Sequence, residues 1–190
     1  MTSDDIILSE LQDHQRAVEQ LIAERDVIRQ MADRIIACLQ SGGKVVFFGN
    51  GGSAADAQHL AAEFVIRYKK NRRSLPSIAL TTDTSMLTAC GNDFGFETIF
   101  SRQVEGLVDQ EDVVIAITTS GNSINVIKGL EEAKKKGCFT ISWTASSGGE
   151  IAKLADLAFR APSATTARAQ ECHMLAGHIL CELVDHVFDT

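Results

Sequence analysis

The stretch KVVFFGNGGSAADAQHLAAEF, residues 44–64, decides the fold that this chain adopts. Its four successive apolar residues, two β-branched and two aromatic, predict a short strand that is buried on both faces. The glycine-rich turn GNGGS follows, and the apolar residues after Ser53 recur at helical spacing. A buried strand that turns directly into a helix is the repeating unit of parallel α/β sheets.

The same alternation of strand and helix continues to the end of the chain. Apolar runs that predict four further buried strands are SIALT at 77–81, DVVIAITT at 112–119, CFTISW at 138–143 and LAFRAP at 157–162. Helical patterns lie at 53–68, 84–107 with a break at 91–95, 123–136, 149–154 and 168–188. This order predicts an α/β fold with a doubly wound, mostly parallel five-stranded sheet. Ligands of such sheets bind beyond the C-terminal ends of the strands.

A helical segment precedes the first strand. Between Ile6 and Gln40 apolar residues recur at helical spacing without a proline, which predicts one long helix or two shorter ones. We expect residues 1–190 to form one domain, in which the helical segment 1–40 is available to pack against another subunit.

Composition excludes several classes of protein. A content of 45% hydrophobic residues in 190 is sufficient for one domain with its own core, and a net charge of −7 argues against a nucleic-acid partner. No apolar run approaches the roughly 18 residues of a membrane span, and the polar start MTSDD does not resemble a signal peptide. We therefore expect no membrane partner and a cytoplasmic location. The five scattered cysteines, without a CxxC pair, predict reduced thiols rather than disulfides or a thiolate zinc site.

Two of the strand-to-helix turns carry groups that suit a phosphate. In GNGGS the glycines permit unusual backbone angles, and Ser53 with Asp56 is a plausible capping pair for the helix that follows. In TTSGNS, residues 118–123, several hydroxyls gather at the start of a helix, where free N–H groups favour an anion without a lysine. Both turns could also be simple helix caps. Neither matches the dinucleotide fingerprint or the P-loop.

Two pairs of polar side chains lie on the helices that flank this region. His59 and Glu63 are four residues apart and so share one helix face, which is the spacing of two metal ligands and also of an ordinary surface pair. Gln170 and His178 are eight residues apart, too far for a direct hydrogen bond, although both could reach one ion. A buried structural role for His178, which lies among apolar residues, is an open alternative.

Several motifs together resemble the sugar isomerase (SIS) domain family. They are GNGGSAADAQHLAAEF, LTTDTSMLTACGNDFGFETIFSRQVE, TTSGNS, SSGG at 146–149 and AQECHMLAGHILCELVD, and they extend from about residue 42 to residue 185. Within the family the chain is similar to the branch that converts sedoheptulose 7-phosphate to D-glycero-D-manno-heptose 7-phosphate through an enediol. That reaction is the first step toward nucleotide-activated heptose for lipopolysaccharide or another surface glycan.

The resemblance implies a role for each matching residue. Glu63 and His178 would be the catalytic base and acid, and the ligands of one zinc ion per subunit would be His59, Glu63, Gln170 and His178. The substrate-binding residues would be Asn50, Gly51, Gly52, Ser53, Glu63, Asn92, Asp93, Thr118, Thr119, Ser120, Ser123 and Gln170. Of these, Asn92 and Asp93 would contact sugar hydroxyls, and the residues of TTSGNS would bind the phosphate. The resemblance also implies a homotetramer whose active sites lie at subunit interfaces.

The residue types agree with this chemistry. A carboxylate can move a proton between C1 and C2 of an open-chain sugar, and an imidazole can serve the oxygens at neutral pH. Two departures from the family pattern border Gln170: Ala169 replaces a usual Ile, and the stretch SATTARA lacks a frequent acidic residue. A non-catalytic SIS protein that binds the replication initiator is the alternative reading. Because such a protein has no carboxylate at the position of Glu63, the sequence favours the enzyme.

Overall fold

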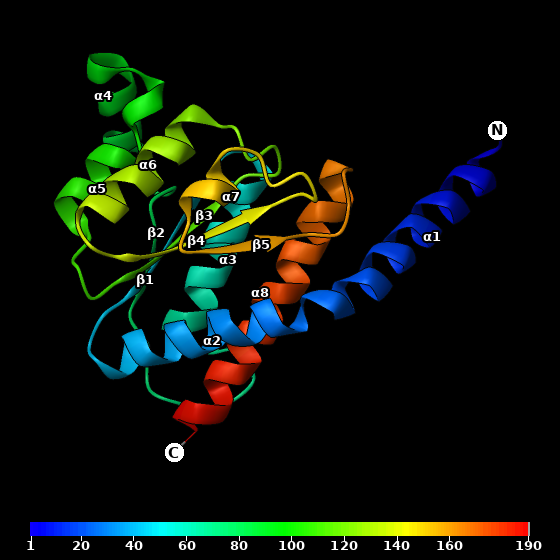
Figure 1. Cartoon of the computed structure of the whole chain (residues 1–190), viewed down its shortest axis with the longest axis horizontal. Coiled ribbons are helices and arrows are strands. Elements are labelled where there is room, and N and C mark those ends of the chain that lie inside the picture. Colours follow the sequence, from blue (N-terminus) through cyan, green and yellow to red (C-terminus); the bar gives the residue numbers. More distant parts are fainter. Residues whose placement is uncertain (190) are drawn as a thin grey trace.

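A computed structural model of the chain describes residues 1–189. Its centre is a five-stranded sheet in the order β2-β1-β3-β4-β5, in which every pair of neighbouring strands is parallel (Figure 1). The strands are β1 Val45–Gly49, β2 Ser77–Ala79, β3 Val113–Ile117, β4 Phe139–Thr144 and β5 Leu157–Arg160. The predicted fold class, a doubly wound α/β sheet preceded by helices, is confirmed.

Helices cover both faces of this sheet. The helices of one face are α2 Arg25–Gln40, α3 Gly52–Val65 and α8 Thr166–Phe188, and those of the other are α5 Ser101–Leu107, α6 Ile124–Lys135 and α7 Ile151–Leu154 (Figure 1). The remaining helices are α1 Ser3–Leu21 and α4 Thr84–Phe94, with the 3₁₀ turns η1 Ile22–Glu24 and η2 Phe96–Thr98. The predicted break in the 84–107 pattern lies at Gly95, whose φ of 89° suits a glycine.

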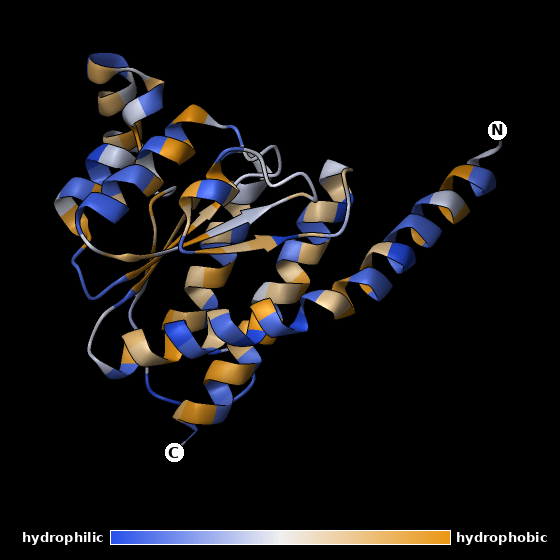
Figure 2. Ribbon diagram, in the orientation of Figure 1, coloured by the Kyte–Doolittle hydropathy of each residue, from blue (hydrophilic) through white to orange (hydrophobic). Residues whose placement is uncertain are grey.

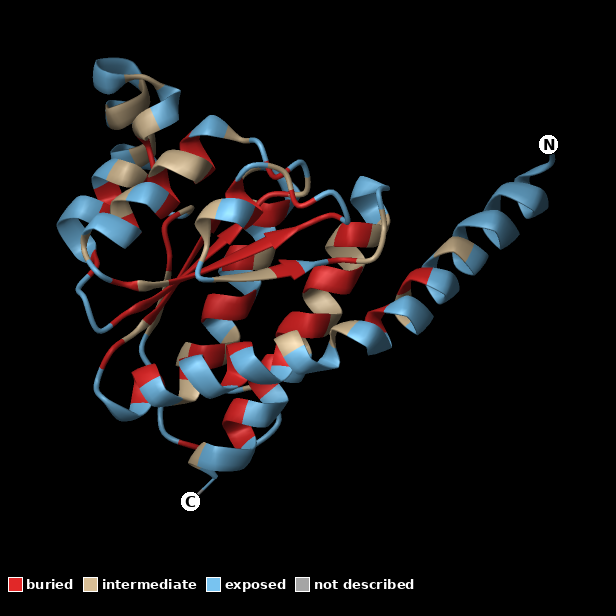
Figure 3. Ribbon diagram, in the orientation of Figure 1, coloured by how far each residue is buried: buried red, intermediate tan, exposed pale blue. Residues whose placement is uncertain are grey.

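Side chains of the central strands divide the core into two layers. In β1, Val45 and Phe47 join the layer under α2, α3 and α8, whereas Val46 and Phe48 join the layer under α5 and α6. β1, β3 and nearly all of β4 are buried (Figure 3), as consecutive apolar residues predict. The prediction of full burial is wrong for β2 and β5, because both are edge strands and most of their residues are only partly covered or exposed.

The N-terminal segment forms two helices, and α1 extends away from the rest of the chain (Figure 1). Only Ala17 and Leu21 of α1 are buried, and apolar residues along its outer part are exposed (Figures 2 and 3). Polar contacts attach it to α8: Arg168 donates to Glu10 Oε2 at 2.9 Å, and His14 Nδ1 lies 2.7 Å from Glu171 Oε2. No helix within residues 1–189 has the length and apolar character of a membrane span.

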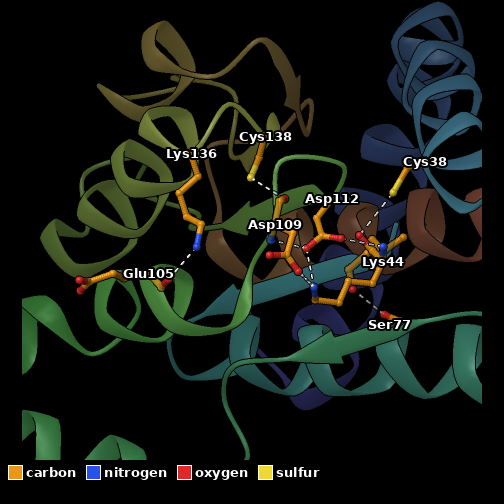
Figure 4. A network of polar contacts seen from close by, with 9 residues as sticks. Cys38, Lys44, Ser77, Glu105, Asp109, Asp112, Lys136 and Cys138 are labelled. Carbon is orange, nitrogen blue, oxygen red and sulfur yellow. Dashed lines mark hydrogen bonds and ion pairs between the residues drawn. The ribbon is translucent and has the colours of Figure 1, made fainter. Parts of the chain in front are cut away.

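A polar network joins β1 to β3 at the end of the sheet where these strands begin (Figure 4). Asp112 accepts hydrogen bonds from the backbone N–H of Lys44 and of Asp109, both at 2.8 Å, and from Lys44 Nζ at 2.6 Å. Burial raises the pKa of the neighbouring Cys38 and Cys138 thiols to about 11, so both are protonated at neutral pH. Both are free thiols, as the sequence predicts, and a buried protonated thiol is a poor nucleophile.

Candidate active site

A polar cavity of about 250 Å³ opens at the C-terminal ends of β1 and β3. Both predicted phosphate loops contribute to it, because their strands are neighbours in the sheet and Gly49 pairs with Ile117. The lining residues are Asn50, Gly52, Ser53, Ile117, Thr118, Thr119, Ser120, Ser123, Thr166 and Gln170. Eight of these lining residues, all except Ile117 and Thr166, are among those predicted to bind substrate or metal. No Lys or Arg of this chain is among the lining residues.

The glycine loop brings α3 and α8 close together. Gly51 precedes α3 with a φ of 56°, which a residue with a side chain rarely adopts. A Cβ on Gly52 would lie 2.2 Å from Gln170 Nε2, so only glycine lets the Gln170 amide approach this backbone. The predicted capping pair is wrong: no side chain caps α3, Ser53 is a buried part of the cavity wall, and Asp56 Oδ2 has no hydrogen-bond partner among residues 1–189.

Three hydroxyls form a cluster in the second loop. Thr118 Oγ1 lies 3.0 Å from Ser123 Oγ and 3.2 Å from Ser120 Oγ. Ser123 stands at the start of α6, and its hydroxyl makes no bond to the backbone of that helix. The first N–H groups of α6 thus add partial positive charge beside the hydroxyl cluster. This arrangement can accept an anion.

The SSGG motif, residues 146–149, packs against the hydroxyl loop, residues 118–123. A Cβ on Gly121 would lie 2.3 Å from the carbonyl oxygen of Gly148, which shows how closely the two backbones pack. Ile151 N donates to Gly121 O at 3.0 Å, and Glu150 N donates to Asn122 Oδ1 at the same distance. The glycines at 148 and 149 therefore serve backbone packing against the hydroxyl loop.

The predicted His–Glu–His set lies between α3 and α8. His59 Nε2 is 3.0 Å from His178 Nε2 and 3.4 Å from Glu63 Oε1. Burial and then the neighbouring His59 lower the pKa of His178, so its imidazole is neutral at pH 7. The set therefore contains side chains that can exchange protons with a bound molecule.

Tyr68 belongs to this site, although it is not among the residues predicted for it. Its ring stacks on the imidazole of His178, with the ring centroids 5.4 Å apart and the planes at 19°. The stacking and the contact with His59 together restrict the orientation of His178. Only the proximity of Tyr68 to the end of α3 could have suggested this contact.

The four predicted metal ligands are not all together. Gln170 lies at Gly52 in the polar cavity, whereas His59, Glu63 and His178 lie farther along α3 and α8. Among residues 1–189, no three His, Cys, Asp or Glu side chains are arranged to hold a metal ion as they stand. Two ligand atoms of one tetrahedral zinc are about 3.3 Å apart. The spacings of 3.0 Å from His59 Nε2 to His178 Nε2 and 3.4 Å from His59 Nε2 to Glu63 Oε1 are close to that value, so the three residues fit zinc in ligand type and the two pairs that include His59 fit it in spacing.

Asn92 and Asp93 lie outside the polar cavity. Both are on α4, which has no buried residue, and Asn92 Nδ2 donates to Asp93 Oδ1 at 2.7 Å. Asp93 lines a separate hollow of about 260 Å³ between α4 and α5. A single copy of the chain therefore does not bring these two residues to the phosphate loops.

Two further long-range contacts hold the site together, and sequence reasoning missed both. The buried guanidinium of Arg72 pairs with Asp185 of α8 and donates to the backbone carbonyls of Glu63 and Phe64 at 2.9 Å. The side-chain amides of Asn50 and Asn125 bond to each other across the two phosphate loops.

Comparison with known proteins places this geometry in a family. The SIS domain family matches residues 11–145. A phosphoheptose isomerase of Aquifex aeolicus is 59% identical over 160 residues, 84% of each chain, and one of Nitratiruptor sp. is 53% identical over 183 residues, 96% of this chain and 98% of that one. The solved phosphoheptose isomerase of Neisseria gonorrhoeae superposes with a TM-score of 0.92 at 39% identity, covering 97% of this chain and 100% of that one. That of Francisella tularensis gives 0.95 at 37% identity, covering 98% and 100%. This chain therefore belongs to the SIS domain family and, within it, to the phosphoheptose isomerases.

Proposed function

We propose that this protein converts sedoheptulose 7-phosphate to D-glycero-D-manno-heptose 7-phosphate. One observation carries the proposal: a proton-transferring set, His59, Glu63 and His178, lies on the two helices that border a hydroxyl-lined cavity. A sugar phosphate needs both parts, one for its phosphate and one for the carbons at its other end. The names of the similar proteins agree with this reaction.

Glu63 is the proposed base for the reaction at carbon. In the open-chain ketose it removes a proton from C1, which leaves an enediol, and it returns the proton to C2. His178, which is neutral at pH 7, moves a proton between the oxygens on C1 and C2. Positioned groups of this kind each contribute about 10²–10⁴-fold to the rate. The stacking of Tyr68 and the contact with His59 fix the ring of His178 for this transfer.

The phosphate end of the sugar binds in the cavity. The hydroxyls of Thr118, Ser120 and Ser123 and the free N–H groups at the start of α6 donate hydrogen bonds to the phosphate oxygens. Thr119, Asn50, Ser53 and the backbone of Gly51 and Gly52 complete the wall around it.

One zinc ion per subunit is part of the proposal. His59, Glu63 and His178 would hold it, and the amide of Gln170 would join them by turning away from Gly52. When bound, zinc polarises the carbonyl and stabilises the negative charge of the enediolate. Since a ligated carboxylate is a poorer base, either the ion would bind weakly and yield to the substrate, or the ligand and base roles would be divided among these four residues.

The proposed assembly is a homotetramer with active sites at the subunit interfaces. An apolar groove of about 480 Å³ runs between the end of α1, η1, α2 and α8, and Ile22 in its lining is 67% exposed. Its lining residues are Val18, Leu21, Ile22, Arg25, Ile28, Arg29, Leu175, Ile179 and Leu183. The exposed Ile7 and Leu11 of a second copy's α1 suit this groove, and assembly would place Asn92 and Asp93 beside a partner's sugar. A monomer in sedimentation equilibrium would contradict this assembly.

The substrate class indicates the cellular compartment in which the reaction takes place. Phosphorylated sugars are metabolites of the cell interior, so the proposal puts the enzyme in the cytoplasm. The product would supply nucleotide-activated heptose for lipopolysaccharide or another surface glycan.

Turnover by the Glu63→Gln variant tests the function. We expect the purified wild-type protein, supplied with zinc, to convert sedoheptulose 7-phosphate, and Glu63→Gln to lose about 10²–10⁴-fold in kcat while keeping its melting temperature. Product is followed by NMR of the sugar phosphates. Equal turnover by both proteins would remove Glu63 from the mechanism. No turnover by either would favour the non-catalytic alternative, a binder of the replication initiator.

A further inference from the structure

Asn50 and Asn125 form a reciprocal pair of hydrogen bonds between the two phosphate loops. Asn50 Nδ2 donates to Asn125 Oδ1 at 2.9 Å, and Asn125 Nδ2 donates to Asn50 Oδ1 at 2.8 Å. Asn50 belongs to the glycine loop after β1, and Asn125 is the second residue of α6, directly after the hydroxyl loop. Because each amide both donates and accepts, the pair fixes the distance and the relative orientation of the two loops.

The side-chain amide of Asn125 has no direct access to a ligand in the cavity, whatever its backbone N–H contributes at the start of α6. Its side chain is buried, with only 4% of the residue exposed, and it is not among the residues that line the cavity. Its Oδ1 also accepts from Val126 N at 3.0 Å, so both polar ends of the amide are used within the protein. Its effect on a bound sugar phosphate can only be transmitted through Asn50 and the loop backbones.

Within the part of the chain that the structure describes, no other hydrogen bond joins the two loops directly. The ladder between β1 and β3 ends at the pair Gly49–Ile117. Among residues 1–189, every other hydrogen bond of 50–53 or 118–125 lies within one loop or goes to another part of the chain. The width of the cavity between the glycine loop and the hydroxyl cluster therefore depends on this amide pair.

We infer that Asn125 is a positioning residue that sets the affinity for the sugar phosphate by holding the glycine loop at a fixed distance from the hydroxyl loop. The inference rests on the proposed function of the cavity. It assigns the effect to binding rather than to proton transfer, because the contacts of His59, Glu63 and His178 lie farther along α3 and α8. The Arg72–Asp185 pair holds those parts of the two helices together independently.

A double-mutant cycle on Asn50 and Asn125 tests this inference. We expect Asn125→Ala to raise KM for sedoheptulose 7-phosphate about tenfold, while kcat changes less than about twofold. In an Asn50→Ala background the same substitution is expected to change KM less than about twofold, because the pair is already broken. Asn125→Ser keeps a hydroxyl that can accept from Val126 N, but its side chain is too short to reach Asn50. We expect the same change in KM as for Asn125→Ala. This variant replaces Asn125→Ala in the experiment if Asn125→Ala does not fold.

Gln103 offers a matched control. It is a buried amide of similar exposure, 5%, and it donates to Leu80 O at 3.1 Å and Ile99 O at 2.8 Å, outside the cavity. Gln103→Ala should lower the melting temperature by about as much as Asn125→Ala and leave KM unchanged. A rise in KM in both variants would show that general destabilisation is the cause and would overturn the inference.

The remaining outcomes separate the inference from the proposed function. Wild-type turnover with an unchanged KM in Asn125→Ala, or independent effects of the two substitutions in the cycle, would overturn the inference and leave the function standing. If the wild-type protein has no turnover, the rise in melting temperature with inorganic phosphate replaces KM as the readout. A phosphate shift lost in Asn125→Ala but kept in Gln103→Ala then supports the inference, and any other pattern overturns it.

Discussion

Arg72 and Asp185 form an ion pair in which each side chain is only 1% exposed, with Arg72 Nε 2.6 Å from Asp185 Oδ1. Asp185 also accepts from the backbone N–H groups of Lys69 and Lys70, and the guanidinium bonds to the last carbonyls of α3. The pair connects the end of α3 to α8, seven residues beyond His178. It thereby fixes the separation of the helices that carry the proton-transferring set.

Breaking this pair should destabilise the protein strongly. Loss of one partner leaves the other charge buried and uncompensated, so Arg72→Met or Asp185→Asn is expected to cost about 3–5 kcal/mol of unfolding free energy. Urea denaturation measures the loss. The exposed pair Lys69–Glu182 is the control, and Lys69→Ala should change the unfolding free energy far less than either substitution at the buried pair. Equal costs at the two sites would show that the buried pair does not hold the helices.

The hydroxyls of the second loop should contribute to affinity and not to folding. Ser120→Ala and Ser123→Ala each remove one donor to a charged phosphate, which is expected to raise KM about tenfold while the melting temperature stays nearly constant. Ser41→Ala, which removes a hydroxyl bonded to Cys38 O outside the cavity, is the control for kinetics. An unchanged KM in both loop variants would contradict phosphate binding at this loop.

Buried His173 should make the protein less stable in mild acid. Burial lowers its pKa to about 4, and its Nε2 donates to Thr144 O between the rings of Trp143 and Phe159. The unfolded chain takes up the proton near pH 6.5 and the folded one only near pH 4, so stability is lost as the pH falls through that interval. The loss amounts to about 3 kcal/mol.

His173→Gln isolates this effect, because glutamine can still donate to Thr144 O but does not titrate. The comparison is needed because a second buried group also titrates in this range. Burial raises the pKa of Asp56 to about 6, so this carboxyl lowers the stability of the protein as the pH rises from about 3.8 to 6, which is opposite to the effect of His173. Urea denaturation of both proteins at pH 4.5 and pH 7.5 gives the difference. Equal pH dependence of the two proteins would show that His173 is not the titrating group.

Zinc should bind to the His–Glu–His set and stabilise the fold. We expect about one zinc per subunit in the purified protein, a lower melting temperature after chelation, and recovery when zinc is added. His59→Ala and His178→Ala should lose the metal, whereas the exposed His186 can be replaced without effect. Elemental analysis and thermal denaturation give both readouts. Protein that stays free of zinc and shows no shift with it would contradict the metal site.

Local patterns were sufficient to predict the framework of the fold. The apolar runs of β1, β3 and β4 and the helical spacing of α3 and α8 are features of consecutive residues, so each could be recognised without its neighbours. His59 and Glu63 were paired correctly because a helix brings residues four apart onto one face. The burial of β2 and β5 was predicted wrongly, since the order of strands in the sheet decides which of them form its edges.

The contacts that shape the site could not be predicted in this way. Asn50 and Asn125 are 75 positions apart, and Arg72 and Asp185 are 113 apart, so nothing in either local stretch marks the partner. The spacing of Asp56 from Ser53 predicts a capping pair, which the structure does not contain. In the structure α3 begins after Gly51 without a side-chain cap, and Ser53 lines the cavity.

The absence of Lys and Arg from the cavity lining has a consequence for how the protein responds to its medium. Mobile ions weaken attraction between full charges over about 10 Å at 0.1 M, but they have little effect on hydrogen bonds made at contact distance inside a hollow. The affinity of these cavity residues for the phosphate should therefore change little between dilute buffer and concentrated electrolyte.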